Sequence, residues 1–117
     1  MYIAMNRFRI IPGEEETFET IWRNREGRLK EVPGYVEFHL LKGPKAEDHT
    51  LYASHTVWET YEDFLAWTKS EAFRQAHANA GQGRKNIYLA GPHFEGFEVV
   101  IAEDRNGERR DLVEKAA

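Results

Sequence analysis

The chain has 117 residues, no cysteine and a formal net charge of −4 at pH 7. This length allows one domain with a modest core, and the absence of thiols excludes disulfides, thiolate metal sites and cysteine nucleophiles. The negative charge argues against a nucleic-acid binder, which needs a surplus of basic residues. No apolar run approaches the roughly 20 residues of a membrane helix, and no secretory leader is evident, so we expect a cytoplasmic protein that does not enter a membrane.

The first element is a predicted strand over residues 2–11, because apolar residues alternate there and Pro12-Gly13 ends the run. Asn6 stands on its mostly apolar face. A helix is predicted from Glu14 to the break at Pro33-Gly34. Acidic residues fill its first turn, which suits the helix dipole, and roughly helical spacing relates Phe18, Ile21, Trp22 and Leu29.

The middle of the chain predicts a hairpin followed by helical segments. Residues 35–42 and 50–58 are rich in aromatic and β-branched residues, with turn-forming residues between them. Capping sequences at Thr60 and at Ser70 predict two short helices or one broken helix. Residues 81–85 form a loop by composition, and residues 93–103 return to a strand.

The resulting order, β-α-β-β-α-β, predicts an α+β domain of the ferredoxin-like split βαβ kind, with helices on one face of an antiparallel sheet. We assign this domain to residues 1–103. Residues 104–117 are charged and contain Asn106-Gly107, so we expect a turn and a mobile or docking tail.

Three residues carry a more specific signal: Asn6 in the first strand, Trp67 in the later helical region, and His77 in the segment His77-Ala78-Asn79. In this order and spacing they resemble the IsdG-type haem-degrading monooxygenases of the antibiotic biosynthesis monooxygenase superfamily. The resemblance extends over roughly residues 1 to 100. It implies a homodimer in which two sheets share one α+β barrel.

The resemblance also implies a role for each of the three residues. His77 becomes the axial ligand of the haem iron, Trp67 presses on the porphyrin and ruffles it, and Asn6 donates a hydrogen bond toward dioxygen on the opposite side. Taken alone, each has a plainer interpretation. His77 is then a surface or cap histidine, Trp67 a core residue beside Phe64, and Asn6 a partner of a neighbouring backbone group.

Further contacts are assigned from residue chemistry. Phe8, Phe18, Trp22 and Phe73 are candidates for an apolar porphyrin pocket or for the general core. Negatively charged propionates require cations, and a solvated surface is the alternative for each candidate, namely Arg25, Arg74, Arg84 and Lys85.

The implied reaction opens the porphyrin oxidatively, with haem as both substrate and cofactor, and releases iron and a bilin-type product. It requires O2 and an external electron donor, either a reductase or a small reductant, because the chain has no G-x-G-x-x-G fingerprint. Two alternatives stay open: a cofactor-free monooxygenase acting on a phenolic or quinol substrate, and a haem-binding protein without turnover.

The remaining histidines give no strong signal. His39 and His55 lie on adjacent predicted strands, where they can face each other, but without a carboxylate at suitable spacing we assign them a structural or surface role. No pattern of candidate ligands or catalytic residues surrounds His49 or His93 in the sequence.

Overall fold

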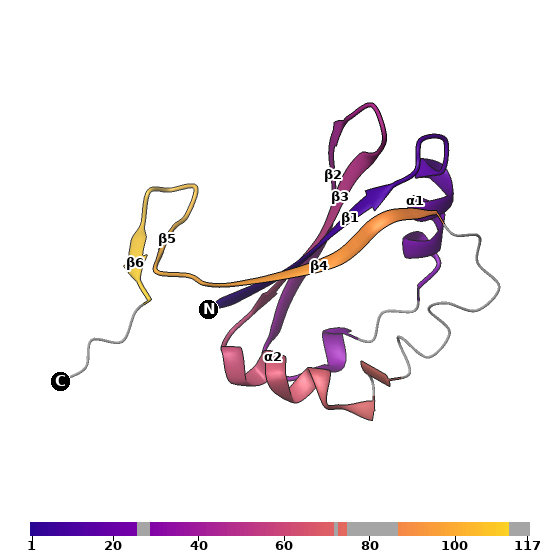
Figure 1. Ribbon diagram of the computed structural model, residues 1–117. Helices are drawn as coiled ribbons and strands as arrows, with labels where there is room; N and C mark the ends of the chain where they lie inside the picture. Colours follow the sequence, from indigo (N-terminus) through magenta and orange to yellow (C-terminus); the bar gives the residue numbers. More distant parts are fainter. Residues whose placement is uncertain (26–28, 72, 75–86, 113–117) are drawn as a thin grey trace.

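The computed structural model describes residues 1–25, 29–71, 73–74 and 87–112, so His77, Arg84 and Lys85 lie outside the described residues (Figure 1). The elements in chain order are β1 (Tyr2–Ile10), α1 (Glu15–Arg23), the 3-10 turn η1 (Leu29–Glu31), β2 (Tyr35–Lys45), β3 (Thr50–Trp58), α2 (Tyr61–Thr68), β4 (Tyr88–Glu98), β5 (Ile101–Glu103) and β6 (Arg109–Asp111).

The first four strands form one antiparallel sheet in the order β2-β3-β1-β4. Strand β1 is central: Tyr2 pairs with Trp58 and Ile10 with Thr50 of β3, while β4 pairs along its other edge. This topology, with α1 and α2 in the crossovers, confirms the predicted ferredoxin-like order.

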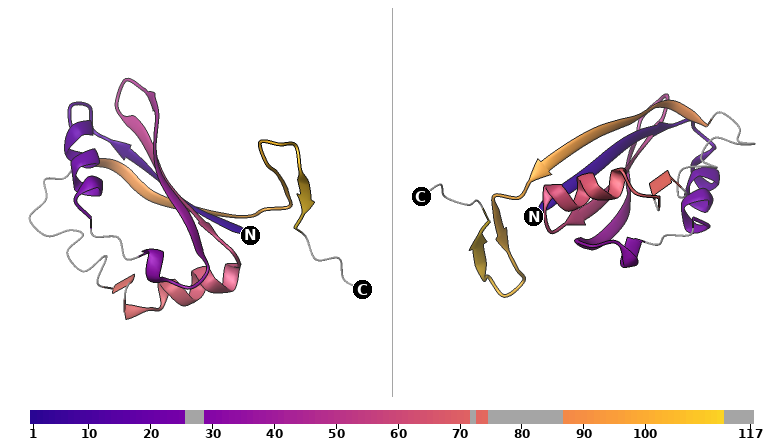
Figure 2. Two further views of the ribbon diagram at one scale, coloured as in Figure 1. Left: turned by 180° about the vertical axis from the view of Figure 1, so that it is seen from behind. Right: turned by 90° about the horizontal axis from the view of Figure 1, so that it is seen from below.

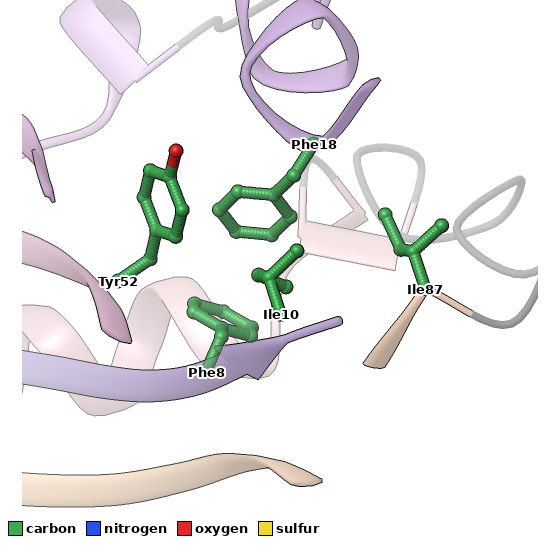
Figure 3. Close-up of a cluster of buried hydrophobic side chains, with 5 residues drawn as sticks. All are labelled: Phe8, Ile10, Phe18, Tyr52 and Ile87. Atoms are coloured by element: carbon green, nitrogen blue, oxygen red, sulfur yellow. The ribbon is translucent and has the colours of Figure 1, made fainter. Parts of the chain in front are cut away.

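Both helices pack on the same face of the sheet, and the opposite face carries no helix among the described residues (Figure 2). The covered face holds two apolar clusters. One, drawn in Figure 3, places Phe18 of α1 over the sheet; its buried members are Phe8, Ile10, Phe18, Tyr52 and Ile87. The other lies under α2, and its buried members are Tyr2, Ala4 and Trp58. The core is therefore divided along β1.

Helix α1 is also held to β3 by two carboxylates. Thr50 Oγ1 donates a hydrogen bond of 2.7 Å to Glu15 Oε2, and the Tyr52 hydroxyl donates to Glu19 Oε2. These bonds are the main cause that lowers the pKa of each glutamate, and burial beside Glu19 raises the pKa of Tyr52. The ionised carboxylates thus join helix and sheet at the edge of the first cluster.

Two predicted elements were wrong in their extent. The helix expected to reach Pro33-Gly34 ends at Arg23, and Leu29 lies in the separate turn η1. The last strand begins at Tyr88 instead of His93, and it leaves the sheet after Glu98, with Ile101–Glu103 in a different pairing. Pro92 lies within β4, which is an edge strand, where a residue without an N–H is tolerated.

Other local predictions are confirmed. Thr60 caps α2 by accepting a hydrogen bond from the backbone N–H of Asp63 at 3.0 Å. The turn at Asn106-Gly107 connects β5 and β6, which form a hairpin that projects from the body of the molecule (Figures 1 and 2). The division into a domain of residues 1–103 and a tail of residues 104–117 stays a prediction. Among the described helices, none has the length and apolar character needed to cross a membrane.

The Glu19–Tyr52 bond gives a pH-dependent contribution to stability. Because the folded-state pKa of Glu19 is lowered, its contribution is complete above the ordinary carboxyl pKa and is lost as pH falls through the lowered value. We expect Tyr52→Phe to reduce the free energy of unfolding by about 1 kcal/mol at pH 7 and to lose most of that difference in acid. Urea unfolding at a series of pH values measures it, with Tyr35→Phe as the control. A difference that stayed constant down to strong acid would contradict the assignment.

Candidate functional site

Asn6 lies at the boundary between the two apolar clusters. On the covered face of β1 its neighbours are Ala4, which belongs to the cluster under α2, and Phe8, which belongs to the cluster under α1. Across the sheet it is opposite Ser54 of β3 and Phe94 of β4. Asn6 is half-buried and is a member of neither cluster. The sequence-based placement of this amide on an apolar strand face is confirmed.

The Asn6 side chain makes no hydrogen bond within the described part of the chain, so the expected backbone partner is not found there. The amide is only half-buried and keeps contact with solvent, so the fold does not have to satisfy it. Nε1 of Trp58, in contrast, is fully buried in the cluster under α2 and has no hydrogen-bond partner among the described residues. The covered face therefore carries hydrogen-bonding capacity that the described fold leaves unused.

On the α1 side of Asn6, aromatic rings form a wall. Trp22 stacks on Phe38 with ring centroids 5.6 Å apart and planes at 17°, and it meets Phe8 edge-on at 6.2 Å. The Arg25 guanidinium carbon lies 4.2 Å from the Trp22 ring centroid, a cation–π contact. This end of the face thus combines apolar surface with a positive charge.

On the α2 side, Trp67 is braced by aromatic neighbours. Its ring centroid lies 5.4 Å from that of Trp58 and 4.8 Å from that of Phe73, the latter at an interplanar angle of 86°. Trp67 is half-buried against the cluster under α2, which agrees with the core role that the sequence also allowed.

The predicted break after Trp67 is confirmed. Helix α2 ends at Thr68, and Ser70 accepts a hydrogen bond from the Phe73 N–H at 3.1 Å while its hydroxyl donates to the Trp67 carbonyl at 2.6 Å. These two hydrogen bonds of Ser70 mark the end of α2 and cap the residues that follow it.

Phe94 is a candidate wall residue that sequence reasoning missed. It lies opposite Asn6, is 53% exposed, and stacks on Phe64 at 5.7 Å with planes at 6°. The sequence identified Phe94 only as part of a strand. Its position beside Asn6 depends on the register between two strands far apart in the chain, for which no local pattern exists.

Arg74 and Phe18, which the sequence offered as haem contacts, have other partners in the structure. Arg74, a candidate for propionate binding, is exposed and forms an ion pair of 2.8 Å with Glu71. Phe18 is completely buried under α1, in contact with Phe8 and Tyr52, which makes it a core residue. The ligand role of His77 and the roles of Arg84 and Lys85 stay predictions.

A hollow of mixed charge lies away from Asn6, between the start of α1 and the turn from β2 to β3. Its carboxylates are already partnered, because Glu19 binds Lys42 at 3.4 Å as well as Arg23 at 2.9 Å, and Glu15 binds Thr50. We therefore regard Asn6 and its two aromatic walls as the candidate site.

The antibiotic biosynthesis monooxygenase family model matches residues 1–79. The chain belongs to this family, whose members are monooxygenase enzymes. Within it the chain resembles the haem-degrading group: it is 32% identical over 101 residues to a haem-degrading monooxygenase of Shouchella clausii, which covers 86% of this chain and 92% of that protein.

Solved structures agree with this membership. The haem degrader MhuD of Mycobacterium tuberculosis, with two haems bound in its active site, has a TM-score of 0.63 and 26% identity, covering 87% of this chain and 99% of MhuD. A mutant of SnoaB, a cofactor-independent oxygenase of Streptomyces nogalater, shares the fold at a TM-score of 0.58 and 17% identity, covering 84% of this chain and 92% of SnoaB. The similarity to SnoaB concerns the fold alone.

The lack of a hydrogen-bond partner for Asn6 among the described residues leads to a prediction about stability. We expect Asn6→Leu to change the free energy of unfolding by less than about 0.5 kcal/mol, because the half-buried amide has no hydrogen bond to lose among the described residues. Urea unfolding of the ligand-free protein measures it. In the matched control, Thr50→Val removes a hydroxyl that does have a partner and should destabilise the fold. A loss of stability in Asn6→Leu equal to that of the control would show that Asn6 is structurally engaged.

Proposed function

We propose that this protein is a haem oxygenase-type monooxygenase that binds haem between the two aromatic walls and opens the porphyrin ring. The observation that carries the proposal is the half-buried Asn6 amide, which has no hydrogen-bond partner among the described residues and lies between Trp22 on one side and Trp67 on the other. A polar side chain between two apolar clusters, without a hydrogen-bond partner among the described residues, is typical of a binding site. Relatives that degrade haem support the choice of ligand.

The chemistry of these residues fits the ligand. A porphyrin has two broad apolar faces and a negatively charged edge, so it requires flat aromatic surfaces and a nearby cation. Trp67, Phe73 and Trp22 supply the surfaces, and the guanidinium of Arg25 beside Trp22 supplies positive charge for a propionate. Phe8 contributes to the same wall as Trp22.

Each proposed role uses a specific atom or surface. An imidazole nitrogen of His77 holds the iron from one side, and the Asn6 amide donates a hydrogen bond toward dioxygen on the other. The Trp67 indole presses against the macrocycle and distorts it. When bound, haem supplies the redox chemistry, and electrons come from an external reductase or small reductant. The expected products are iron and a bilin, and the expected location is the cytoplasm.

The hypothesis is tested by titrating the purified protein with hemin, following the Soret band, and adding ascorbate under air with catalase. We expect saturable binding, and then Soret decay with iron release. His77→Ala should weaken binding by about tenfold or more, and Asn6→Leu should retain binding but slow the decay. His93→Ala is the control, because His93 is exposed and pairs with Arg7, outside the proposed site.

Each departure from this result has a defined meaning. Absence of binding in the folded protein would favour the cofactor-free monooxygenase acting on a phenolic or quinol substrate. Binding without Soret decay under reductant would favour a haem-binding protein without turnover. Equal affinity of His77→Ala and the starting protein would contradict the ligand role of His77.

We also propose a homodimer formed through the face of the sheet that has no helix. Phe97 of β4 and Leu41 of β2 point to this face and are 46% and 40% exposed. The β5–β6 hairpin leaves Val100 and Ile101 each 54% exposed, and a two-stranded hairpin is marginally stable on its own. Apolar surface of this extent is best explained by a second copy that covers it.

The dimer is tested by sedimentation velocity. We expect the starting protein to sediment as a dimer and Phe97→Glu to shift it to monomer, because a charge would be buried at the interface. Phe94→Glu is the matched control, since Phe94 is a phenylalanine of the same strand, 53% exposed against 46% for Phe97, that faces the helices. A monomer at all concentrations, or dissociation only in the Phe94 variant, would contradict this interface.

A further inference from the structure

Two histidines face each other on the helix-free side of the sheet. His39 of β2 is directly opposite His55 of β3, and their Nδ1 atoms are 3.5 Å apart. The ring centroids are separated by 5.5 Å and the planes are inclined at 46°. His55 is half-buried and His39 is exposed. The pair is on the face opposite Asn6, so the proposed haem function does not involve it.

The distance between the two Nδ1 atoms is close to the distance between two nitrogen ligands of one tetrahedral metal ion. Two Zn–N bonds of about 2.0–2.1 Å that meet at a tetrahedral angle place the nitrogens about 3.3–3.4 Å apart, whereas adjacent positions of a square-planar site require about 2.8 Å. The observed 3.5 Å separation is that of a hydrogen bond between the two Nδ1 atoms, so a metal ion would replace this bond, and the rings would turn until both nitrogens point to the ion.

The backbone also favours chelation. Strand pairing holds the two Cα atoms opposite each other without a ligand, so little conformational entropy is lost when both rings turn to one ion. Imidazole is a common ligand of zinc in proteins.

The surroundings limit the number of ligands. Met5 is the next residue in the same row, and Glu95 beyond it is held by Arg7 at 2.7 Å. Among the described residues no group of three or more His, Cys, Asp or Glu residues is arranged around a common point. The described residues of one chain therefore supply two imidazoles, and water or a second copy supplies further ligands.

We propose that His39 and His55 form a bidentate site for a divalent transition metal that accepts tetrahedral geometry, with Zn²⁺ as its preferred ion. The site is independent of the haem cleft. The pair lies on the face that we propose for dimerisation, so a second copy brings its own pair to the same interface.

The test uses the full, haem-free chain. Zn²⁺ is titrated by calorimetry, and Co²⁺ serves as a spectroscopic substitute, because tetrahedral Co²⁺ has intense visible absorption. We expect saturable Zn²⁺ binding with one ion per chain or one per two chains, and a tetrahedral Co²⁺ spectrum. His39→Ala and His55→Ala should each weaken Zn²⁺ binding by at least about tenfold and abolish that spectrum.

The matched control is His93→Ala, which removes a histidine from the same face. His93 is on β4, two strands from His55 and therefore about 10 Å away by strand spacing, so Zn²⁺ binding should be unchanged. Circular dichroism verifies that each variant is folded. The proposal is overturned if the folded starting protein binds neither ion saturably, or if His39→Ala and His55→Ala bind Zn²⁺ as tightly as His93→Ala does. Loss of haem binding alone would have no bearing on this site.

Discussion

The pairing of β1 with strands on both of its edges is the constraint on which the rest of the structure depends. Side chains alternate along a strand, so this pairing decides that Asn6 shares a face with Ala4 and Phe8. A slip of one residue would turn Arg7 to the helix-covered face and expose Phe8. Arg7 forms an ion pair with Glu95 on the other face, which agrees with this register, although an exposed pair of this kind contributes little to stability.

The two helices divide the covered face without filling it uniformly. Phe18 centres one cluster and Trp58 the other, and each helix reaches the strand residues nearest to it. A single continuous core would bury more apolar surface and be more stable. The divided core leaves a polar residue of β1, Asn6, between Ala4 of one cluster and Phe8 of the other.

The sequence determined strands better than it determined the ends of other elements. β3 matches its prediction at both ends because its alternation is uninterrupted. The helix was extended wrongly to Leu29 because this residue keeps the apolar spacing, yet it packs from a 3-10 turn onto the cluster under α2. Asn6 and Trp67 were identifiable as residues, whereas Phe94 became a neighbour of Asn6 only through non-local pairing. The periodicity of a sequence predicts which face of a strand is buried. It does not predict which strands pair with each other.

The packing of Trp67 determines what this residue can do to a ligand. A flat macrocycle bends only against a surface stiffer than itself, and an isolated exposed indole would rotate away. Trp67 has Trp58 on one side at 5.4 Å and Phe73 on another at 4.8 Å, so its rotation would require the surrounding aromatic side chains to move. Because aromatic interiors are close-packed, this movement is costly. The core role and the proposed distorting role of Trp67 are therefore compatible, since the first supplies the rigidity that the second requires.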